Sequence, residues 1–147
     1  MRDEQVKRYA RHIQLADIGG LGQTALMVAR ARLPLRESDP AAELIAASYL
    51  AAGGVGTIAV ANANEQQRAA LTALGPDSRI VELDDGEPVR VGSASPMRRD
   101  SMQDARETVT LAQRPAWWPS ATGDHVALAF WRGGAAAAAW MIATTSR

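Results

Sequence analysis

The chain has 147 residues, a length that fits one domain with a hydrophobic core of its own. Basic and acidic side chains number 16 each, so the formal net charge is zero, and we expect neither nucleic acid nor an anionic membrane as a partner. Cysteine is absent, which excludes disulfides, thiolate catalysis and a cysteine-ligated zinc. The first residues carry mixed charge without the apolar run of a signal peptide, so we expect a cytoplasmic protein.

The first 30 residues predict a helical hairpin. In the stretch RYARHIQLADI, the side chains of Tyr9, His12 and Ile13 recur at the spacing of an amphipathic helix. The GGLG that follows resembles a phosphate-binding loop, but such a loop follows a buried strand, and none is predicted before it. We therefore expect these glycines to end one helix and to form the turn to the next.

Residues 31–147 predict an α/β core. ARLPL is a short apolar piece interrupted by Arg32 and Pro34, and SDPAAELIAASYLAAGG is a helix with a cap at Ser38 or Asp39. VGTIAVAN is a buried strand, NEQQRAALTALGP a second helix, and SRIVELDD a second strand. The alternation of strands and helices favours a mainly parallel sheet with flanking helices.

The last third of the chain is less regular at first. Residues 86–123 are rich in proline, serine, arginine and aspartate, and their structure stays open. After them, DHVALAFW predicts a buried strand and GGAAAAAWMIATT a helix. Together these two segments have the length of a membrane span, but Arg132 lies in the middle. We expect part of the core instead, and no contact with a membrane.

Other candidate site residues are few. His12 and His125 are the only histidines, and the acids of ELDDGE lack the spacing of a calcium loop, so we predict no metal site. Trp117 and Trp118 lie between prolines, next to arginines. We expect this pair to cover an edge of the core or to contact a partner protein, and not to stack on nucleic acid.

Three motifs in a fixed order, RYARHIQL, GQTAL and YLAAGGVGTIAV, resemble the E1-like activating enzymes of the ThiF/MoeB/HesA family. The resemblance covers about residues 7–60, extends weakly to Val81 and is poor afterwards. It implies a single Rossmann-like domain that begins with a helical segment and pairs with a second subunit. Members of the family use ATP and magnesium to adenylate the C-terminal glycine of a ubiquitin-like or sulfur-carrier protein.

The resemblance implies a degenerate nucleotide site. It places the phosphate-binding glycines of the family at about residues 38–43, which here begin with Ser38, Asp39 and Pro40 and contain no glycine. Asp39 would set a negative charge against phosphate, and Pro40 has no N–H to offer. Asn62 and Asn64 stand where the family has acids, one of which binds the ribose hydroxyls. The cationic and metal-binding residues of the family also lack counterparts, so we expect no ATP, magnesium or catalytic residue.

The resemblance retains the N-terminal arginines. In the family, the second arginine of the RYxRQ motif reaches the ATP phosphates of the partner subunit, and this position is Arg11, with Arg8 nearby. The hypothesis is a non-catalytic subunit that forms a homodimer, or a heterodimer with an intact E1-like protein, and lends Arg11 in trans. Its interface is expected to include the residues Tyr9, His12, Ile13, Trp117 and Trp118. Alternatively, Arg8 and Arg11 are ordinary solvated residues of a helix.

Two further functions stay open from the sequence. One is an active adenylyltransferase for a ubiquitin-like or sulfur-carrier protein, with a rebuilt nucleotide site. The other is a module that binds a peptide or small ligand in the altered cleft. The sequence does not separate the second of these from a dimerising subunit.

Overall fold

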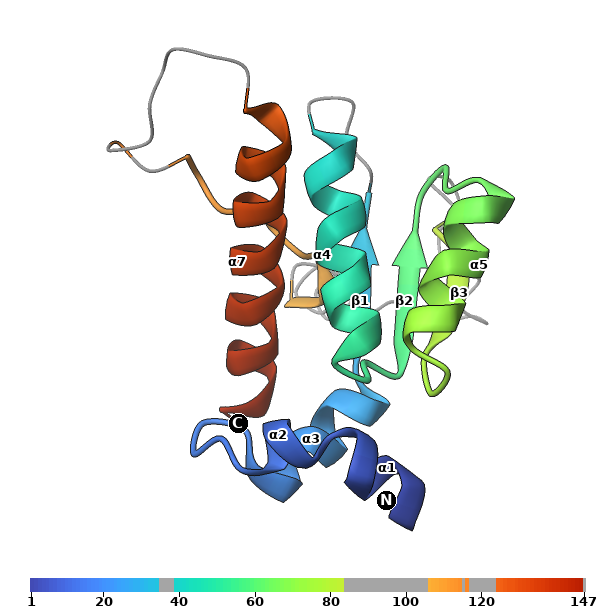
Figure 1. Ribbon diagram of the computed structural model, residues 1–147, viewed down its shortest axis with the longest axis vertical. Helices are drawn as coiled ribbons and strands as arrows, with labels where there is room; N and C mark the ends of the chain where they lie inside the picture. The colour runs from blue at the N-terminus through green and yellow to red at the C-terminus, as the bar shows by residue number, and fades with distance from the viewer. Residues whose placement is uncertain (35–38, 84–105, 115, 117–123, 147) are drawn as a thin grey trace, which may run out of the picture.

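The computed structural model describes residues 1–34, 39–83, 106–114, 116 and 124–146. It is a mixed α/β fold in which helices flank a small three-stranded parallel sheet (Figure 1). In chain order, the elements are α1 (Asp3–Arg8), α2 (Ala10–Ile13), α3 (Gly19–Val28), β1 (Arg30–Leu33), α4 (Pro40–Ala52), β2 (Thr57–Val60), α5 (Glu65–Leu74), β3 (Arg79–Glu82) and α7 (His125–Thr145).

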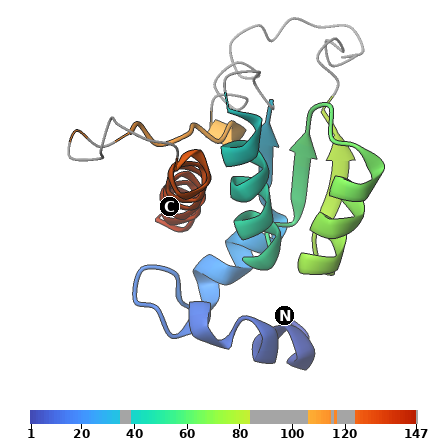
Figure 2. The same cartoon turned by 45° about the horizontal axis from the view of Figure 1, so that its top comes forward.

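The three strands lie in the order β1-β2-β3, with Arg30 beside Thr57 and Thr57 beside Arg79. Helices α4 and α5 cover one face of the sheet, and α7 lies alongside α4 (Figures 1 and 2). Helices α1–α3 lie at the amino-terminal ends of the strands (Figure 1). The sheet therefore has an amino-terminal edge covered by α1–α3 and, at its other end, a carboxyl-terminal edge where a nucleotide would bind in such a fold.

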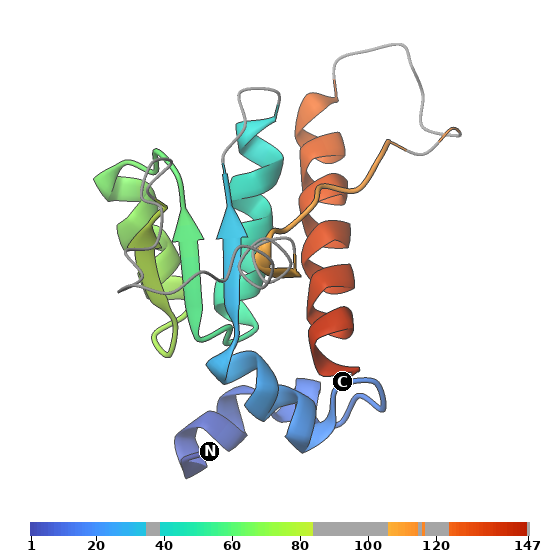
Figure 3. The same ribbon diagram turned by 180° about the vertical axis from the view of Figure 1, so that it is seen from behind.

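The core lies between the sheet, α4 and α7, and small side chains dominate it. Its fully buried members include Ala46, Ala47, Leu50, Ile58 and Ala137. On the edge of β1 away from β2, Thr108 forms an isolated parallel bridge with Arg32, and the backbone N–H of Val109 donates to the carbonyl of Arg32 at 3.0 Å (Figure 3). The resulting parallel α/β core confirms the expected alternation of strands and helices.

Most of the predicted element ends are confirmed. Asp39 caps α4 by accepting from the N–H of Ala42 at 3.1 Å, with Pro40 in the first turn. Asn64 caps α5 in the same way, accepting from the N–H of Gln67 at 2.8 Å. ARLPL holds a true strand, because β1 ends at Leu33 and the proline that follows takes no part in its hydrogen-bonded ladder.

The prediction of a strand at DHVALAFW is wrong, because α7 runs through it from His125 to Thr145. A continuous apolar run does not distinguish a strand from a helix by its periodicity. Asp124 settles the start of the helix by accepting from the N–H of Ala127 at 2.9 Å. Gly133 is not a boundary but a packing position, since a Cβ there would lie 2.3 Å from the carbonyl oxygen of Ala42.

The prediction that the GGLG glycines end a helix is also wrong, because α3 begins at Gly19, which has a φ of +61°. The turn lies just before, at residues 14–18. Gly22 is buried against Thr145 of α7, where a larger residue would be 3.0 Å from the threonine side chain. The expectation that no strand precedes these glycines is confirmed, and they are packing residues of a helical hairpin.

Helix α7 is long and apolar enough to cross a membrane, by length and composition alone, and 22% of its most apolar window is buried inside the chain. Its inner side is part of the core. Trp140 donates from Nε1 to the carbonyl of Arg106 at 3.1 Å, and Arg132 pairs with Asp39. These polar contacts tie the helix to the rest of the fold.

Candidate functional site

Helix α4 begins at the carboxyl-terminal edge of the sheet. In Rossmann-like folds, the phosphate of a dinucleotide or of ATP lies at this edge. Here one carboxylate oxygen of Asp39 accepts from the N–H of Ala42 at 3.1 Å, and its other oxygen pairs with the guanidinium of Arg132. Arg132 also donates from Nε to the carbonyl of Ala112 at 3.0 Å. A carboxylate and its arginine counter-ion therefore stand at the helix terminus.

Polar groups at the ends of β2 and β3 also form hydrogen bonds with other groups of the chain. Asn62 has a φ of 54°, a left-handed conformation that asparagine tolerates, and its backbone N–H donates to Oε1 of Glu82 at 2.8 Å. Glu82 also accepts from Arg68 at 2.6 Å, and the same guanidinium nitrogen donates to the carbonyl of Ala63 at 2.6 Å. Asn64 is occupied in capping α5. Asn62 and Asn64 thus serve the local fold, and Ser38 lies outside the described residues.

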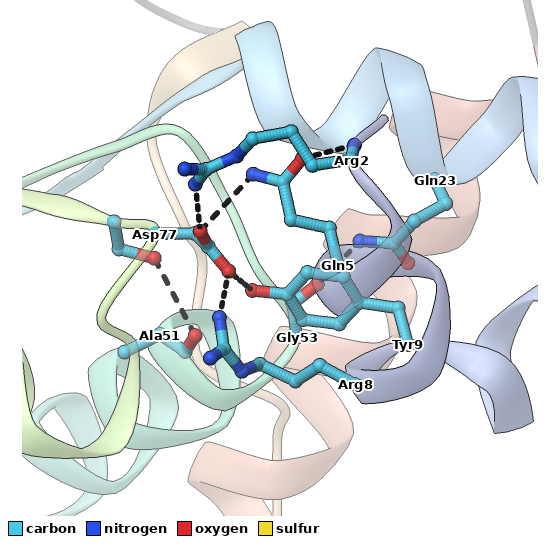
Figure 4. Close-up of polar contacts among 9 residues, drawn as sticks. Arg2, Gln5, Arg8, Tyr9, Gln23, Ala51, Gly53 and Asp77 are labelled. Atoms are coloured by element: carbon cyan, nitrogen blue, oxygen red, sulfur yellow. Dashed lines mark hydrogen bonds and ion pairs between the residues drawn. The ribbon is translucent and has the colours of Figure 1, made fainter.

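A second polar cluster lies at the amino-terminal edge and centres on Asp77, in the turn before β3 (Figure 4). Its carboxylate accepts from Nε2 of Gln5 at 3.0 Å and from the hydroxyl of Tyr9 at 3.0 Å. Arg8 and the more exposed Arg2 form ion pairs with it. We call these five residues the N-terminal clasp, because they attach α1 and the α1–α2 junction to the sheet.

The electrostatics of the clasp favour the charged form of Asp77. Its side chain is 7% exposed, and burial by itself raises its pKa. Hydrogen bonds from Gln5, Tyr9 and Arg8, with the charge of Arg8, outweigh burial and hold the pKa below its ordinary value. Burial raises the pKa of Tyr9, and the bond to Asp77 raises it further, so the phenol stays protonated as a donor.

The three motifs of the family resemblance meet beside the clasp. Gln23 is fully buried, its Nε2 donates to the carbonyl of Gly53 at 3.0 Å, and its Oε1 lies 3.1 Å from Nδ1 of His12. The ring of Tyr9 lies over Gly54, where a Cβ would be 2.5 Å from the ring and where φ is +78°. Residues of RYARHIQL, GQTAL and YLAAGGVG thus form one packed unit.

The predicted interface residues differ in what they offer a partner. Tyr9 is 2% exposed and has its hydroxyl bonded to Asp77, so the expectation that it contacts a partner needs correction: its role is internal. His12 is half-buried, with its ring stacked on that of Tyr9 at 6.3 Å between centroids, and Ile13 is half-buried. Trp117 and Trp118 lie outside the described residues.

The two predicted arginines also differ. Arg8 is held by Asp77 within its own chain. Arg11 is exposed on α2, and within the described part of the chain it forms no hydrogen bond or ion pair. Because α2 lies at the amino-terminal edge of the sheet, Arg11 stands at the opposite end from the carboxyl-terminal edge of its own chain (Figure 1).

Comparison of the sequence with protein-family models and with curated proteins gives no match. The resemblance to E1-like enzymes therefore rests on the motif residues alone. Among the described residues, no group of three or more acidic or histidine side chains is placed to hold a metal ion. At the two edges of the sheet, Asp39, Glu82 and Asp77 each bond to other groups of the chain.

Proposed function

We propose that this chain is a non-catalytic, Rossmann-like member of the E1-like family that acts as a dimerising or regulatory subunit. In this proposal, it binds no ATP or magnesium of its own and supplies Arg11 to the nucleotide site of an active E1-like adenylating partner. The partner's ubiquitin-like or sulfur-carrier substrate would then contact the complex, while this chain contributes structure and one cation.

One observation carries the proposal: the Asp39–Arg132 pair at the amino terminus of α4. A phosphate at a helix amino terminus is held by free N–H groups and by the positive end of the helix dipole. Here a carboxylate of the chain already takes the hydrogen bond of Ala42 and the cation of Arg132. Bound phosphate would have to displace that carboxylate or lie against its negative charge.

The arginines support the other half of the proposal. Arg8 pairs with Asp77 within the chain, whereas Arg11 is exposed on α2, where a partner could reach it. An arginine supplied in trans stabilises phosphate charge, and its planar fork can bind two oxygens together. The clasp would then hold α2 rigidly enough to present Arg11 in a fixed place.

Pyrophosphate exchange by an intact E1-like enzyme from the same genome tests the proposal. Adding the wild-type chain should raise the exchange rate, whereas Arg11→Ala should lose nearly all of the increase and Arg11→Lys should lose at least about tenfold. Arg79→Ala, an exposed arginine on β3, is the matched control and should stimulate as the wild type does. Full stimulation by Arg11→Ala, with the complex intact, would contradict a trans arginine.

A further inference from the structure

Helix α2 carries Arg11 but has little of its own to hold that residue in place. It is a single turn of four residues, Ala10–Ile13, and none of its side chains is buried. A helix of one turn is not stable by itself, because its first hydrogen bond fixes the dihedral angles of several residues. The position of Arg11 therefore depends on the contacts that attach this turn to the rest of the chain.

A hydrogen bond between His12 and Gln23 attaches α2 directly. Gln23 is fully buried, and its Nε2 donates to the carbonyl of Gly53 at 3.0 Å (Figure 4). Because that carbonyl can only accept, the amide of Gln23 is fixed with its Oε1 toward Nδ1 of His12, at 3.1 Å. Nδ1 must then carry a proton, so the hydrogen bonds assign the Nδ1–H form to the neutral ring of His12.

Gln23 itself is rigidly placed. It lies on α3, and the end of α3 is bonded to the turn before β2, where the N–H of Gly56 donates to the carbonyl of Leu26 at 3.0 Å. A Cβ at Gly56 would lie 2.1 Å from the carbonyl oxygen of Met27, so the two backbone segments are in close contact. Gly53, which accepts from Gln23, is the C-cap of α4. Gln23 therefore joins α2 to two elements of the core.

We propose that Gln23 is a positioning residue: its hydrogen bond to His12 fixes the rotation of α2, and so the direction in which Arg11 leaves the chain. The inference rests on the proposed function, in which Arg11 binds phosphate oxygens in a partner. His12 and Arg11 are neighbours in one helical turn, about 100° apart around its axis. The ring that bonds Gln23 is thus turned inward, while Arg11 stays exposed.

Small rotations of α2 matter for a contact made in trans. Side chains extend about 5–6 Å from a helix axis, so a rotation of about 10° moves their ends by about 1 Å. A displacement of that size at a group that stabilises a transition state can lower a rate about 100-fold. The ring stack of His12 on Tyr9, at 6.3 Å between centroids, adds contact but no directional bond. The bond to Gln23 supplies the direction.

Titration of an intact E1-like enzyme with variants of this chain separates positioning from binding. In pyrophosphate exchange, His12→Leu should lower the maximal stimulated rate at least about tenfold and leave the half-saturating concentration of the chain unchanged. His12→Asn, whose Nδ2 can take the place of Nδ1 and donate to Gln23, should restore most of the rate. His125→Leu, at the exposed histidine that begins α7, is the matched control and should stimulate as the wild type does.

A double variant shows whether His12 acts through Arg11. The losses caused by His12→Leu and by Arg11→Lys should be less than additive, because a misplaced arginine and a lysine fail at the same contact. Full additivity, or a full rate with His12→Leu alone, would overturn the proposal. A raised half-saturating concentration with an unchanged maximal rate would overturn it as well, because His12 would then contact the partner directly.

The tautomer of His12 tests the attachment without a partner. Nitrogen NMR of the whole wild-type chain, labelled with 15N-histidine, should show the Nδ1–H form for the neutral ring of His12, and the exposed His125 serves as the reference. An Nε2–H form would overturn the assigned hydrogen bond and the positioning role with it. Because this measurement uses the wild type alone, it decides the attachment even if His12→Leu fails to fold.

Failure of this inference and failure of the proposed function give different results. If the wild type does not stimulate, or if Arg11→Ala stimulates fully, the proposed function is wrong and the role of Gln23 falls with it. If Arg11→Ala loses the stimulation while His12→Leu keeps it, Arg11 acts in trans and only the positioning role is wrong.

Discussion

Replacement of Asp77 by alanine should detach the N-terminal helices from the sheet and lower the free energy of unfolding. Asp77→Ala removes the acceptor of two donors, Nε2 of Gln5 and the hydroxyl of the buried Tyr9, each at 3.0 Å. A hydrogen bond to a charged group contributes about 1.5 kcal/mol, so the two together give about 3 kcal/mol. The ion pairs to Arg2 and Arg8 add little, because those guanidinium groups are 73% and 40% exposed.

Urea denaturation followed by tryptophan fluorescence measures this change. In a chain of 147 residues, a loss of about 3 kcal/mol corresponds to a decrease in Tm of about 10 °C. Asp17→Ala is the control, because Asp17 is exposed and its side chain has no hydrogen bond within the described residues. A loss below about 0.5 kcal/mol, no larger than that of an ordinary surface substitution, would refute the structural role of Asp77.

Three further predictions follow from the same contacts. Because folding lowers the pKa of Asp77, its ionised carboxylate adds to the free energy of unfolding above about pH 3.9, and this contribution is lost as the pH falls below that value. The free energy of unfolding of Asp77→Asn, followed by circular dichroism, should therefore fall less between about pH 5 and acidic pH than that of the wild type. Gly54→Ala should cost at least about 2 kcal/mol in urea denaturation, since φ is +78° and the new Cβ would meet Tyr9; wild-type stability would contradict that packing. Asp39→Ser should free the guanidinium of Arg132 and create millimolar affinity for pyrophosphate, detected by calorimetry, whereas no gain would show that the carboxylate is not what excludes the anion.

Local signals in the sequence predicted much of the α/β fold. The cap at Asp39, Pro40 after it and the glycines after α4 mark helix ends, because these residues satisfy or release backbone groups at fixed positions. Strands β2 and β3 were found from short apolar runs between such ends. The secondary structure predicted for the first part of α7 was wrong, because a run of alanine and other apolar residues without alternation suits a buried strand and a buried helix equally.

The candidate site was harder to predict because its hydrogen-bonded residues lie far apart in the sequence. Asp77 looks like an ordinary turn residue in GPDS, and its partners Gln5 and Tyr9 lie about seventy residues earlier. Gln23 lies inside the GQ motif, yet nothing local indicates that its amide would bond His12 and Gly53. A signal was present at Gly54, since a glycine pair at a helix end often marks a left-handed residue.

The packing beside the clasp also gives a physical role to the residues of the three motifs. Tyr9, Gln23 and Gly54 join the N-terminal helices to the end of α4, and these contacts involve no nucleotide. The motif residues therefore have a structural role in this fold whether or not a nucleotide binds, and catalysis has to be argued from the residues at the carboxyl-terminal edge.

Titration of the purified chain with ATP and magnesium in a calorimeter tests the central claim most directly. The claim is that Asp39 and Arg132 stand in the place of a phosphate, so that the chain holds no nucleotide of its own. We predict no binding heat up to millimolar ATP, with an intact E1-like enzyme as the positive control. Saturable binding with a micromolar Kd would contradict the claim and favour an active adenylyltransferase.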